Sequence, residues 1–264
     1  MVFARAVLIA TWNVNSIRAR HERVKGWLEL RKPDVVCLQE LKVEDEKFPR
    51  AEYEALGWHV ATHGQRTYNG VAILSRLPLG EVTRGLEDGE DDLQARLISA
   101  TIGGVRVLCA YAPNGESLGS DKYQYKLRWF GRLRRYLDQR FTPQSPLALL
   151  GDLNVAPEPR DVHDPHRWEP TVLFHADARA ALMQVTQFGL TDAFRLKRDE
   201  PGLFTWWDYR AGAFHKNQGL RIDHVYVTSP LVPRVVSAEI DREARKGKPT
   251  PSDHAPVLVE VGGV

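Results

Sequence analysis

The sequence has very little cysteine and no long apolar runs. Only Cys37 and Cys109 occur among its 264 residues, each inside a short apolar run typical of a buried strand. Two separated, buried thiols argue against a disulfide framework and for a reducing compartment. The apolar runs fall far short of the roughly 20 residues that a bilayer span needs, and the start lacks a long apolar segment with a cleavage site. We therefore expect a soluble cytoplasmic protein that does not enter a membrane.

A strong excess of one charge is also absent. Lys and Arg number 36 against 34 Asp and Glu, for a formal net charge of +2, so any nucleic-acid surface must be a local patch. With 43% hydrophobic residues, the chain can bury a substantial core, which excludes disorder as its main description. No linker or composition shift divides it. We expect one domain over residues 1–264, and a monomer.

Short β-rich runs bounded by Gly, Pro and Asn recur along the chain and predict strands. These runs are residues 7–13, 35–39, 71–74, 97–102, 105–111, 147–151, 222–228 and 257–261. Residues 16–30 and 121–140 each repeat apolar side chains on one face and predict helices. Within residues 97–111 there is no room for a helix, and Gly103-Gly104 predicts a hairpin turn. Mixed or antiparallel sheets covered by helices therefore fit better than a purely alternating βαβ plan.

Polar side chains interrupt these runs at the strand ends. Glu40 and Asp152 end their runs, whereas Asp223 and the Asp253-His254 pair precede theirs. The C-terminal end of one strand lies beside the start of its antiparallel neighbour, so all four carboxylates could share one edge. A single Asp at a strand end is usually a turn or cap residue. Converging carboxylates, however, repel one another unless a cation lies between them, and oxygen ligands without cysteine suit Mg²⁺ or Mn²⁺.

Seven motifs extend this pattern from residue 12 to residue 256. They are WNVNSIR at 12–18, LQELK at 38–42, YAPNG at 111–115, GDLNV at 151–155, TWWDYR at 205–210, GLRID at 219–223 and PSDHAP at 251–256. In this order they resemble the exonuclease III family of DNA-repair nucleases, part of the endonuclease/exonuclease/phosphatase superfamily. The 38–42, 151–155 and 251–256 motifs are shared across the superfamily and indicate only metal-dependent phosphoester cleavage. Those at 12–18, 205–210 and 219–223 indicate the DNA-repair branch.

The resemblance implies a fold and an activity. The fold is α/β (α+β), a four-layered αββα sandwich of two mixed β-sheets flanked by helices. The activity is metal-dependent cleavage of duplex DNA 5′ to abasic sites, together with 3′–5′ exonuclease and 3′-phosphatase or phosphodiesterase activity. The substrates are duplex DNA with abasic sites or damaged 3′ ends. The balance among the three activities depends on loops, and residues 155–170 and 211–218 are the candidates for that selection.

Roles for individual residues follow from the same resemblance. The metal ligands are Glu40, Asn13, Asp152, Asn154 and Asp253, acting directly or through water, with Mg²⁺ as cofactor and Mn²⁺ as a substitute. The catalytic residues are Asp152, His254, Asp223, Tyr111 and Asn154. Asp152 is the expected proton-transfer residue. His254, oriented by Asp223, either donates to a phosphate oxygen or places the attacking water, and the sequence leaves open which of the two residues activates that water.

The residues expected to contact DNA are Asn114, Lys122, Trp206, Arg210 and Arg221. Adjacent strand side chains point to opposite faces, so one of Trp206 and Trp207 can pack in the core while the other faces a nucleotide. A basic helix face, such as residues 122–128, is usually only solvated surface. The basic loop at 242–249 directly precedes the Asp253-His254 corner, and we expect it to approach DNA and to make binding steeply salt-dependent.

Three alternatives remain open at the level of sequence. GESLG at 115–119 matches the G-x-S-x-G pattern, so Ser117 could form a serine-hydrolase triad with His254 and Asp223, although a polar loop is a poor place for the required elbow. The same fold could act on RNA or on a phospholipid or inositol phosphate. A catalytically inactive DNA-binding module is disfavoured, because every expected catalytic position carries a competent side chain.

Overall fold

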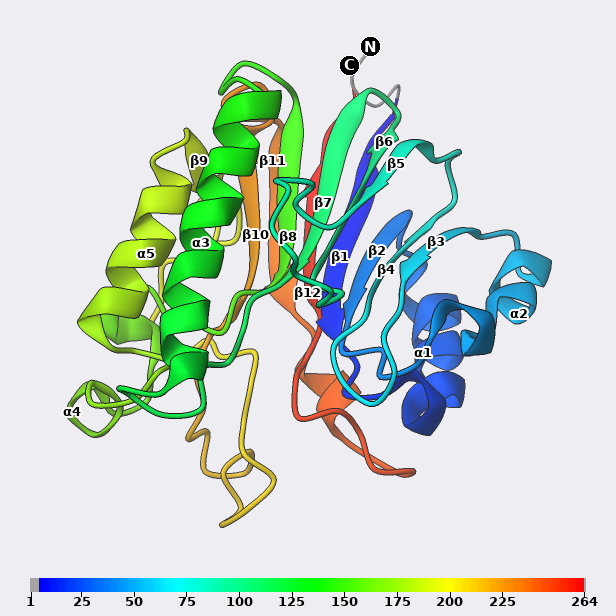
Figure 1. The fold of residues 1–264 in the computed structure, drawn as a ribbon. Coiled ribbons are helices and arrows are strands. Elements are labelled where there is room, and N and C mark those ends of the chain that lie inside the picture. Colours follow the sequence, from blue (N-terminus) through cyan, green and yellow to red (C-terminus); the bar gives the residue numbers. More distant parts are fainter. Residues whose placement is uncertain (1–4, 264) are drawn as a thin grey trace.

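Two six-stranded β-sheets lie face to face between two layers of helices in the computed structural model, which describes residues 5–263 (Figure 1). This four-layered α/β arrangement confirms the predicted fold class. One sheet has the order β11-β12-β1-β2-β4-β3, and the other has the order β5-β6-β7-β8-β10-β9. Each contains a single parallel pair, β1 with β2 and β7 with β8, among otherwise antiparallel neighbours.

The first sheet is made from both ends of the chain. Its strands are β1 (Val7–Asn13), β2 (Val35–Gln39), β3 (His59–His63), β4 (Val71–Ser75), β11 (Val235–Ile240) and β12 (Val257–Val261). Helix α1 (Ile17–Arg31) connects the parallel strands β1 and β2, because such a connection needs a crossover. With α2 (Arg50–Ala55), it covers the outer face of this sheet (Figure 1). Trp12 of β1 and Trp27 of α1 pack in that layer with ring centroids 5.3 Å apart.

The second sheet repeats this plan with the middle of the chain. Its strands are β5 (Gly80–Arg84), β6 (Leu97–Ile102), β7 (Val105–Tyr111), β8 (Leu147–Asp152), β9 (Leu190–Asp192) and β10 (Asp223–Thr228). Helix α3 (Asp121–Arg140) connects the parallel strands β7 and β8, and α5 (Ala176–Thr186) packs beside it. The short helix α4 (Pro165–Trp168) and the 3₁₀ turns Asp45–Lys47, Pro159–Asp161, Val232–Arg234 and Arg242–Arg245 lie in connections.

The central strands are buried on both faces, because each has the other sheet on one side and helices on the other. Every residue of β2, β4, β8 and β10 is buried, which explains their nearly continuous apolar runs. Cys37 and Cys109 lie in the core between the two sheets as free thiols, as expected. No helix of residues 5–263 combines the length and the apolar character needed to span a bilayer.

The eight predicted strands and both predicted helices are confirmed with ends within one residue. The hairpin at Gly103 and Gly104 is also present, with φ angles of 52° and 78°. The sequence analysis missed strands β3, β5, β9 and β11 and helices α2, α4 and α5. All four of these strands lie at the edge of a sheet, and β9 has only three residues, so they carry few buried side chains and give a weak apolar signal.

Candidate active site

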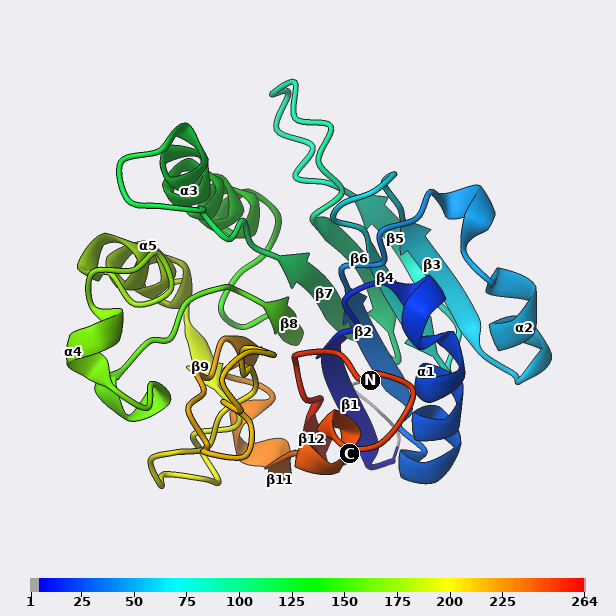
Figure 2. The ribbon, with the colours of Figure 1, turned by 90° about the horizontal axis from the view of Figure 1, so that it is seen from below.

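Segments that end or begin the central strands meet at one end of the sandwich, which Figure 2 shows end-on. Across the β8–β10 ladder Asp223 lies opposite Asp152, and across the β7–β8 ladder Tyr111 lies opposite Asp152. The first sheet contributes Asn13 at the end of β1 and Glu40 directly after β2. The predicted shared edge of carboxylates is therefore present, and it includes residues from both sheets.

Asn13 connects the two sheets at this edge. Its Nδ2 donates to Oε1 of Glu40 and to Oδ2 of Asp152, each at 2.8 Å. The Tyr111 hydroxyl donates to the same Glu40 oxygen at 3.0 Å, and Nζ of Lys42 lies 2.8 Å from its other oxygen. Glu40 has a φ of 53°, a left-handed conformation that non-glycine residues adopt rarely and often at functional sites. The Glu40 carboxylate is thus fixed by three side chains.

His254 and two carboxylates form a buried row beside Asn13. Nδ1 of His254 lies 2.8 Å from Oδ2 of Asp223, and its Nε2 lies 3.8 Å from Oδ2 of Asp152. Glu40, Asp152 and His254 each offer one ligand atom, and these three atoms lie within 4.8 Å of one another. The convergence on which the sequence argument depends is therefore present.

Burial and neighbouring charges shift the pKa values of these groups. Burial, with Asp223 adding to it, raises the pKa of Asp152 to about 7 despite the opposing charge of His254. Burial alone would lower the pKa of His254, but the carboxylates of Asp223 and Asp152 outweigh it and raise that pKa to about 10. Burial likewise opposes ionisation of Glu40, yet Lys42 and the Asn13 amide bring its pKa below the usual value. The site thus holds a charged imidazole beside a carboxyl group that titrates near neutrality.

This donor set suits a divalent cation. Glu40 and Asp152 place carboxylate oxygens around one amide in a buried site, and a cation relieves the repulsion between such groups. Asn13 and Asn154 carry amide oxygens, which such ions also prefer, but here Oδ1 of Asn13 accepts from the Asn15 backbone N–H and Oδ1 of Asn154 accepts from Asn114. Both cysteines are buried as free thiols away from this group. The exposed group of His21, Glu22 and Glu52 is different, because the Lys25 ammonium lies 3.0 Å from Glu52 and supplies the positive charge there.

The comparisons with known proteins agree with this geometry. The pattern of the endonuclease/exonuclease/phosphatase family matches residues 10–254. The chain belongs to this family. Exodeoxyribonuclease III of Haemophilus influenzae is 36% identical over 262 residues, which are 95% of this chain and 98% of that protein, so the exonuclease III resemblance is confirmed.

Two solved structures are also similar over nearly the whole length. An AP endonuclease from Archaeoglobus fulgidus has a TM-score of 0.94 and 42% sequence identity, covering 98% of this chain and 100% of its own. A Neisseria 3′ phosphatase bound to a product DNA hairpin has a TM-score of 0.92 and 40% identity, covering 97% and 99%.

In this family member, the loop after β8 depends on a glycine and an asparagine. Gly151 has a φ of 152°, and a Cβ there would lie 1.8 Å from the carbonyl oxygen of Ala110 on β7. Only glycine therefore fits at this position, directly before Asp152. The Asn154 backbone N–H donates to Oδ1 of Asp152 at 2.9 Å. Asn114 Nδ2 donates to Oδ1 of Asn154 at 3.2 Å. Two predicted site residues, Asn114 and Asn154, thus lie together beside Asp152.

Asp253 is turned toward the tryptophan side of the site. Its Oδ2 accepts from Nε1 of Trp206 at 2.9 Å, and its Oδ1 accepts from Nδ2 of Asn15 at 2.9 Å. Asp253 does not belong to the group of possible ligand atoms that Glu40, Asp152 and His254 form. The predicted ligand Asp253 therefore contacts Trp206 and lies outside that group.

Trp206 and Trp207 divide into one accessible and one buried ring, as expected, although they lie outside the strands and Trp206 forms only isolated bridges. Trp207 is fully buried, whereas Trp206 is half-buried and lines a cavity that also includes His163, Trp168 and Arg210. The Trp168 ring meets the Trp206 ring edge-on, with centroids 6.0 Å apart. Arg210 is 88% exposed and pairs with Asp208 at 2.7 Å. Both predicted DNA contacts, Trp206 and Arg210, are accessible from this cavity.

Arg221 does not reach the site, although it was expected to bind DNA. Only 2% of it is exposed, because it pairs with Asp161 at 2.7 Å and with Asp192 at 2.7 Å behind the active-site edge. Its Nη1 also contacts Nδ1 of His224 at 3.1 Å, and the other His224 nitrogen contacts the Val155 carbonyl at 2.9 Å. Arg221 and His224 therefore hold the 155–170 loop against β10.

Lys122 and two arginines of the 242–249 loop have partners within the protein. Lys122 is exposed at the start of α3, where it pairs with Glu116 at 3.0 Å. In the loop, Arg242 lies 4.9 Å from the Trp207 ring centroid, and Arg245 is buried and donates to the Ser252 carbonyl at 2.9 Å. The two arginines support the tryptophan and the Asp253-His254 corner, because their guanidinium groups contact protein.

Ser117 lacks the geometry of a hydrolase nucleophile. It is exposed in the loop before α3, and no strand-to-helix elbow surrounds it. The two His254 nitrogens face Asp223 and Asp152. This arrangement contradicts the serine-hydrolase alternative.

Two site residues were missed by sequence reasoning. Lys42 pairs with Glu40 and donates to Oδ1 of Asn15 at 2.7 Å; its place in the LQELK motif was the available signal. Lys126 is fully buried, and its ammonium donates to the carbonyls of Asn114, Asn154 and Val172. Its position on a basic stretch of α3 had indicated solvated surface, and nothing in the sequence signalled burial.

Proposed function

We propose that this protein is a metal-dependent DNA-repair phosphodiesterase that cleaves duplex DNA 5′ to abasic sites. We include 3′–5′ exonuclease and 3′-phosphatase activity, because removing a 3′ group is the same phosphoester chemistry on a differently shaped end. The observation that carries the proposal is the joint placement of Glu40, Asp152 and His254 around Asn13, beside the accessible Trp206. The names of the relatives, which include an exodeoxyribonuclease III, an AP endonuclease and a 3′ phosphatase, support it.

Glu40 and Asp152, helped by Asn13 and Asn154, are the residues that would hold Mg²⁺, with Mn²⁺ as a substitute. When bound, the ion neutralises charge on the phosphate and stabilises the leaving oxygen. Lys42 and Tyr111 fix the Glu40 carboxylate in place for this role.

The chain's own groups supply proton transfer and hydrogen bonds. His254, kept charged by Asp223, donates from Nε2 to a non-bridging phosphate oxygen. Asp152 has a pKa near 7, which suits a group that accepts a proton from water. We assign the hydroxyl of Tyr111 and the amide of Asn154 as donors to the charge that develops on the phosphate, and such preorganised donors are commonly worth about 3 to 4 kcal/mol each.

A duplex with an extruded or terminal nucleotide is the substrate that fits best. The cavity beside Trp206 is lined by Trp168 and His163, and aromatic rings stack on a base at about 1 to 3 kcal/mol each. Arg210, at the rim, is exposed enough to contact a phosphate. RNA and phospholipid or inositol phosphate stay as alternative substrates of the same site. We further propose that the enzyme is monomeric and cytoplasmic; the two unpaired cysteines support a reducing compartment.

The decisive experiment uses four labelled substrates with the purified protein. Duplexes carry one abasic site, a 3′ phosphate or a plain recessed end, and a matched RNA duplex is the fourth. Each is incubated with Mg²⁺, with Mn²⁺, with EDTA, and with phenylmethylsulfonyl fluoride plus Mg²⁺. We expect cleavage of the DNA substrates that only EDTA abolishes. Preferred cleavage of the RNA, or no cleavage of any DNA duplex, would contradict the proposed substrate.

A further inference from the structure

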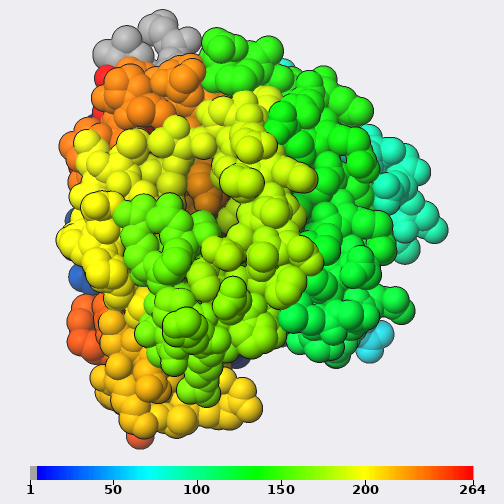
Figure 3. Space-filling model, turned by 90° about the vertical axis from the view of Figure 1, so that its left-hand side faces the viewer, coloured from blue at the N-terminus to red at the C-terminus, as the bar shows by residue number. Residues whose placement is uncertain are grey.

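A second cavity opens on the outer face of the second sheet, whose strands run from β5 to β9, away from the candidate active site. It has a volume of about 540 Å³ and lies between α5, β9, β10 and residues 157–160. Figure 3 shows the hollow, with the orange surface of β10 visible between the yellow and yellow-green segments. Side chains alternate along β10, so Asp223 faces the active site whereas Tyr226 belongs to the outer core and lines the cavity. The two sites thus lie on opposite faces of one strand.

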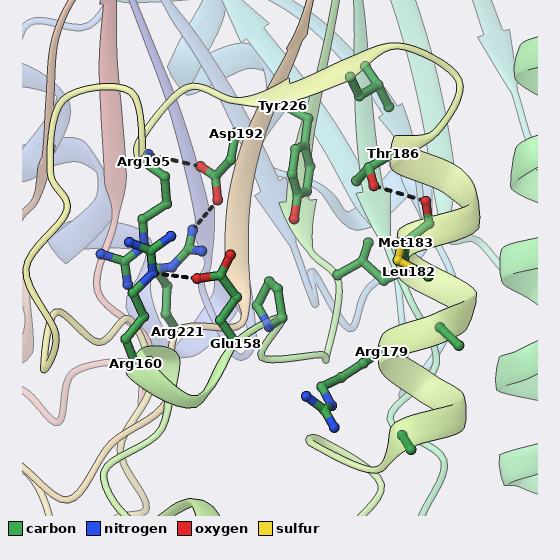
Figure 4. A pocket seen from close by; sticks show the side chains of 14 residues that line it. Glu158, Arg160, Arg179, Leu182, Met183, Thr186, Asp192, Arg195, Arg221 and Tyr226 are labelled. Carbon is green, nitrogen blue, oxygen red and sulfur yellow. Dashed lines mark hydrogen bonds and ion pairs between the residues drawn. The ribbon is translucent and has the colours of Figure 1, made fainter.

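One wall of this cavity is apolar and the other is charged (Figure 4). The apolar wall is formed by α5, with Ala180, Leu182 and Met183, and Met183 remains 54% exposed. The charged wall carries Glu158, Arg160, Asp192, Arg195 and Arg221. A small-molecule site commonly combines a largely apolar lining with a few placed polar groups, in a volume of about 300 to 1,000 Å³.

The carboxylates of the charged wall already have cationic partners. Glu158 pairs with Arg160 at 2.5 Å, and Asp192 pairs with Arg221 at 2.7 Å. The remaining arginine of this wall, Arg195, forms an ion pair with the buried Asp161. No uncompensated negative charge therefore lines the cavity, so a ligand cation has no partner there.

Arg179 is different, because its guanidinium has no ion pair or hydrogen bond with any residue from 5 to 263. It projects from α5 into the cavity (Figure 4) and lies 4.6 Å from the Phe174 ring centroid, a contact that fixes its direction. Its Nε is buried without a hydrogen-bond partner. A guanidinium in this state is a ready binding group for carboxylate or phosphate.

Tyr226 supplies a second unused polar group. The residue is 4% exposed, its ring stacks on His224 with centroids 5.4 Å apart, and its hydroxyl points into the cavity (Figure 4). Across the described part of the chain no group hydrogen-bonds to this hydroxyl. The hydroxyl is therefore a polar group of the lining that has no protein partner among the described residues and is open to the cavity.

We propose that this cavity binds a small anion with a flat apolar body, an aromatic phosphate monoester or an aromatic carboxylate. The anionic group binds the guanidinium of Arg179. The apolar body packs against Leu182 and Met183 of α5. This site is separate from the nuclease centre, so its occupation does not require a metal ion.

Isothermal titration of the wild-type protein in EDTA tests the proposal with four probes. These are 1-naphthyl phosphate, 2-naphthoate, 1-naphthol and inorganic phosphate. We expect the two naphthyl anions to bind with the higher affinity, and the better of them identifies the anionic group. 1-Naphthol lacks the charge and inorganic phosphate lacks the apolar body, so each should bind at least about tenfold more weakly, as the loss of a charge-assisted contact or of a buried ring implies.

Variants of the lining locate the binding. Arg179→Met should weaken binding of the better anion by about tenfold or more, whereas Arg179→Lys should retain most of the affinity. Arg198→Met, which removes an arginine paired with Glu200 outside the cavity, is the matched control and should bind as the wild type does. Nuclease activity should be unchanged in all three variants, because neither Arg179 nor Arg198 belongs to the active site.

Three results would overturn this assignment. The first is that neither naphthyl anion binds the wild-type protein. The second is equal affinity of the anions for wild type and for Arg179→Met, with both proteins shown to be folded by circular dichroism. The third is displacement of the bound anion by a short DNA duplex, which would place it in the active site.

Discussion

Asp223 begins β10 of one sheet and His254 lies in the segment just before β12 of the other, and Oδ2 of Asp223 lies 2.8 Å from Nδ1 of His254 with both side chains buried. The pair fixes the ring so that Nε2 faces Asp152. Burial opposes the charged imidazole, and the Asp223 carboxylate is the largest factor that outweighs it. Oδ1 of Asp223 is buried without a hydrogen-bond partner, so an amide could replace the carboxylate and still accept from His254. One substitution therefore separates the charge of Asp223 from its geometry.

Asp223→Asn should lower the pKa of His254, because it removes the negative charge that keeps the ring protonated. The folded-state pKa, about 10 in the wild type, falls, and the alkaline limb of kcat/KM moves to lower pH. We expect kcat to fall on the order of 10² to 10⁴-fold, the range of general acid–base effects. NMR titration of the imidazole in metal-free protein gives the pKa directly. An unchanged pKa in the variant would show that Asp223 does not set the charge of His254.

Asp152→Asn should abolish turnover and leave DNA binding intact. The amide keeps an oxygen for the Asn13 hydrogen bond but cannot accept a proton from water, so the loss should exceed about 10²-fold. Removing a negative charge from the site should not weaken attraction of the phosphate backbone. Single-turnover cleavage of an abasic duplex measures the first effect, and fluorescence anisotropy of the same duplex in EDTA measures the second. Near-normal turnover would refute the role of Asp152.

The strand ends could be predicted, and with them most of the catalytic centre. Glu40, Asp152 and Asp223 adjoin strands whose apolar runs are continuous, so their position along the chain fixes the edge on which they lie. Asn13 could be assigned to the site, but its bridging of Glu40 and Asp152 could not. That contact depends on how the two sheets face each other, which no local pattern records.

Charged residues were the main source of error. Arg221 follows a motif glycine and was expected to meet DNA, yet it is buried because Asp161, 60 residues earlier in an irregular loop, pairs with it. Lys126 lies on a basic helical stretch but is buried among backbone carbonyls. A long polar side chain is buried only when partners are supplied from elsewhere in the fold, and such partners are invisible in a single sequence.

Replacing each of the two adjacent tryptophans should separate stability from substrate binding. Trp207 is fully buried, so Trp207→Ala should lower the free energy of unfolding by about 3 to 5 kcal/mol. Trp206→Ala removes a half-buried ring and should destabilise the fold less, but should weaken kcat/KM for an abasic duplex by the equivalent of about 1 to 3 kcal/mol. Urea denaturation and kinetics below KM provide the two readouts. The division of roles is wrong if Trp206→Ala leaves kcat/KM unchanged.

His224 should make folding depend on pH between about 4 and 6.5. Burial, with the charge of Arg221 adding to it, lowers the pKa of His224 to about 4 in the folded protein, whereas an unfolded histidine titrates near 6.5. The unfolded chain therefore binds more protons in this window, and the unfolding free energy falls as pH drops through it. The full difference is about 3 kcal/mol, present above pH 6.5 and lost by about pH 4.

Urea denaturation at several pH values tests this assignment through a pair of variants. His224→Gln removes the titrating ring and should flatten the pH dependence of the unfolding free energy between pH 4 and 6.5. His59→Gln, at an exposed position in β3, is the matched control and should retain the slope of the wild type. The same slope in both variants would mean that other groups cause the acid sensitivity.

Lys126 should support both stability and turnover without touching DNA. Its buried ammonium donates to the carbonyls of Asn114 at 3.1 Å, Asn154 at 2.7 Å and Val172 at 2.6 Å. Lys126→Met fills similar space but leaves three buried carbonyls without this donor. The variant no longer has to bury an ammonium group, which offsets only part of the lost stability. We expect the unfolding free energy to fall by about 2 to 4 kcal/mol and kcat to fall more than DNA affinity, because Asn114 and Asn154 lose their support.

Lys122→Met is the matched control for this last change, one helical turn earlier on α3. The Lys122 side chain is 70% exposed and pairs only with Glu116, and exposed ion pairs of this kind contribute about 0 to 1 kcal/mol. Stability and kcat of that variant should therefore stay close to the wild type, with at most a small, salt-sensitive change in DNA affinity. If the two lysine variants behave alike, the carbonyl contacts of Lys126 do not hold the asparagine loops in place.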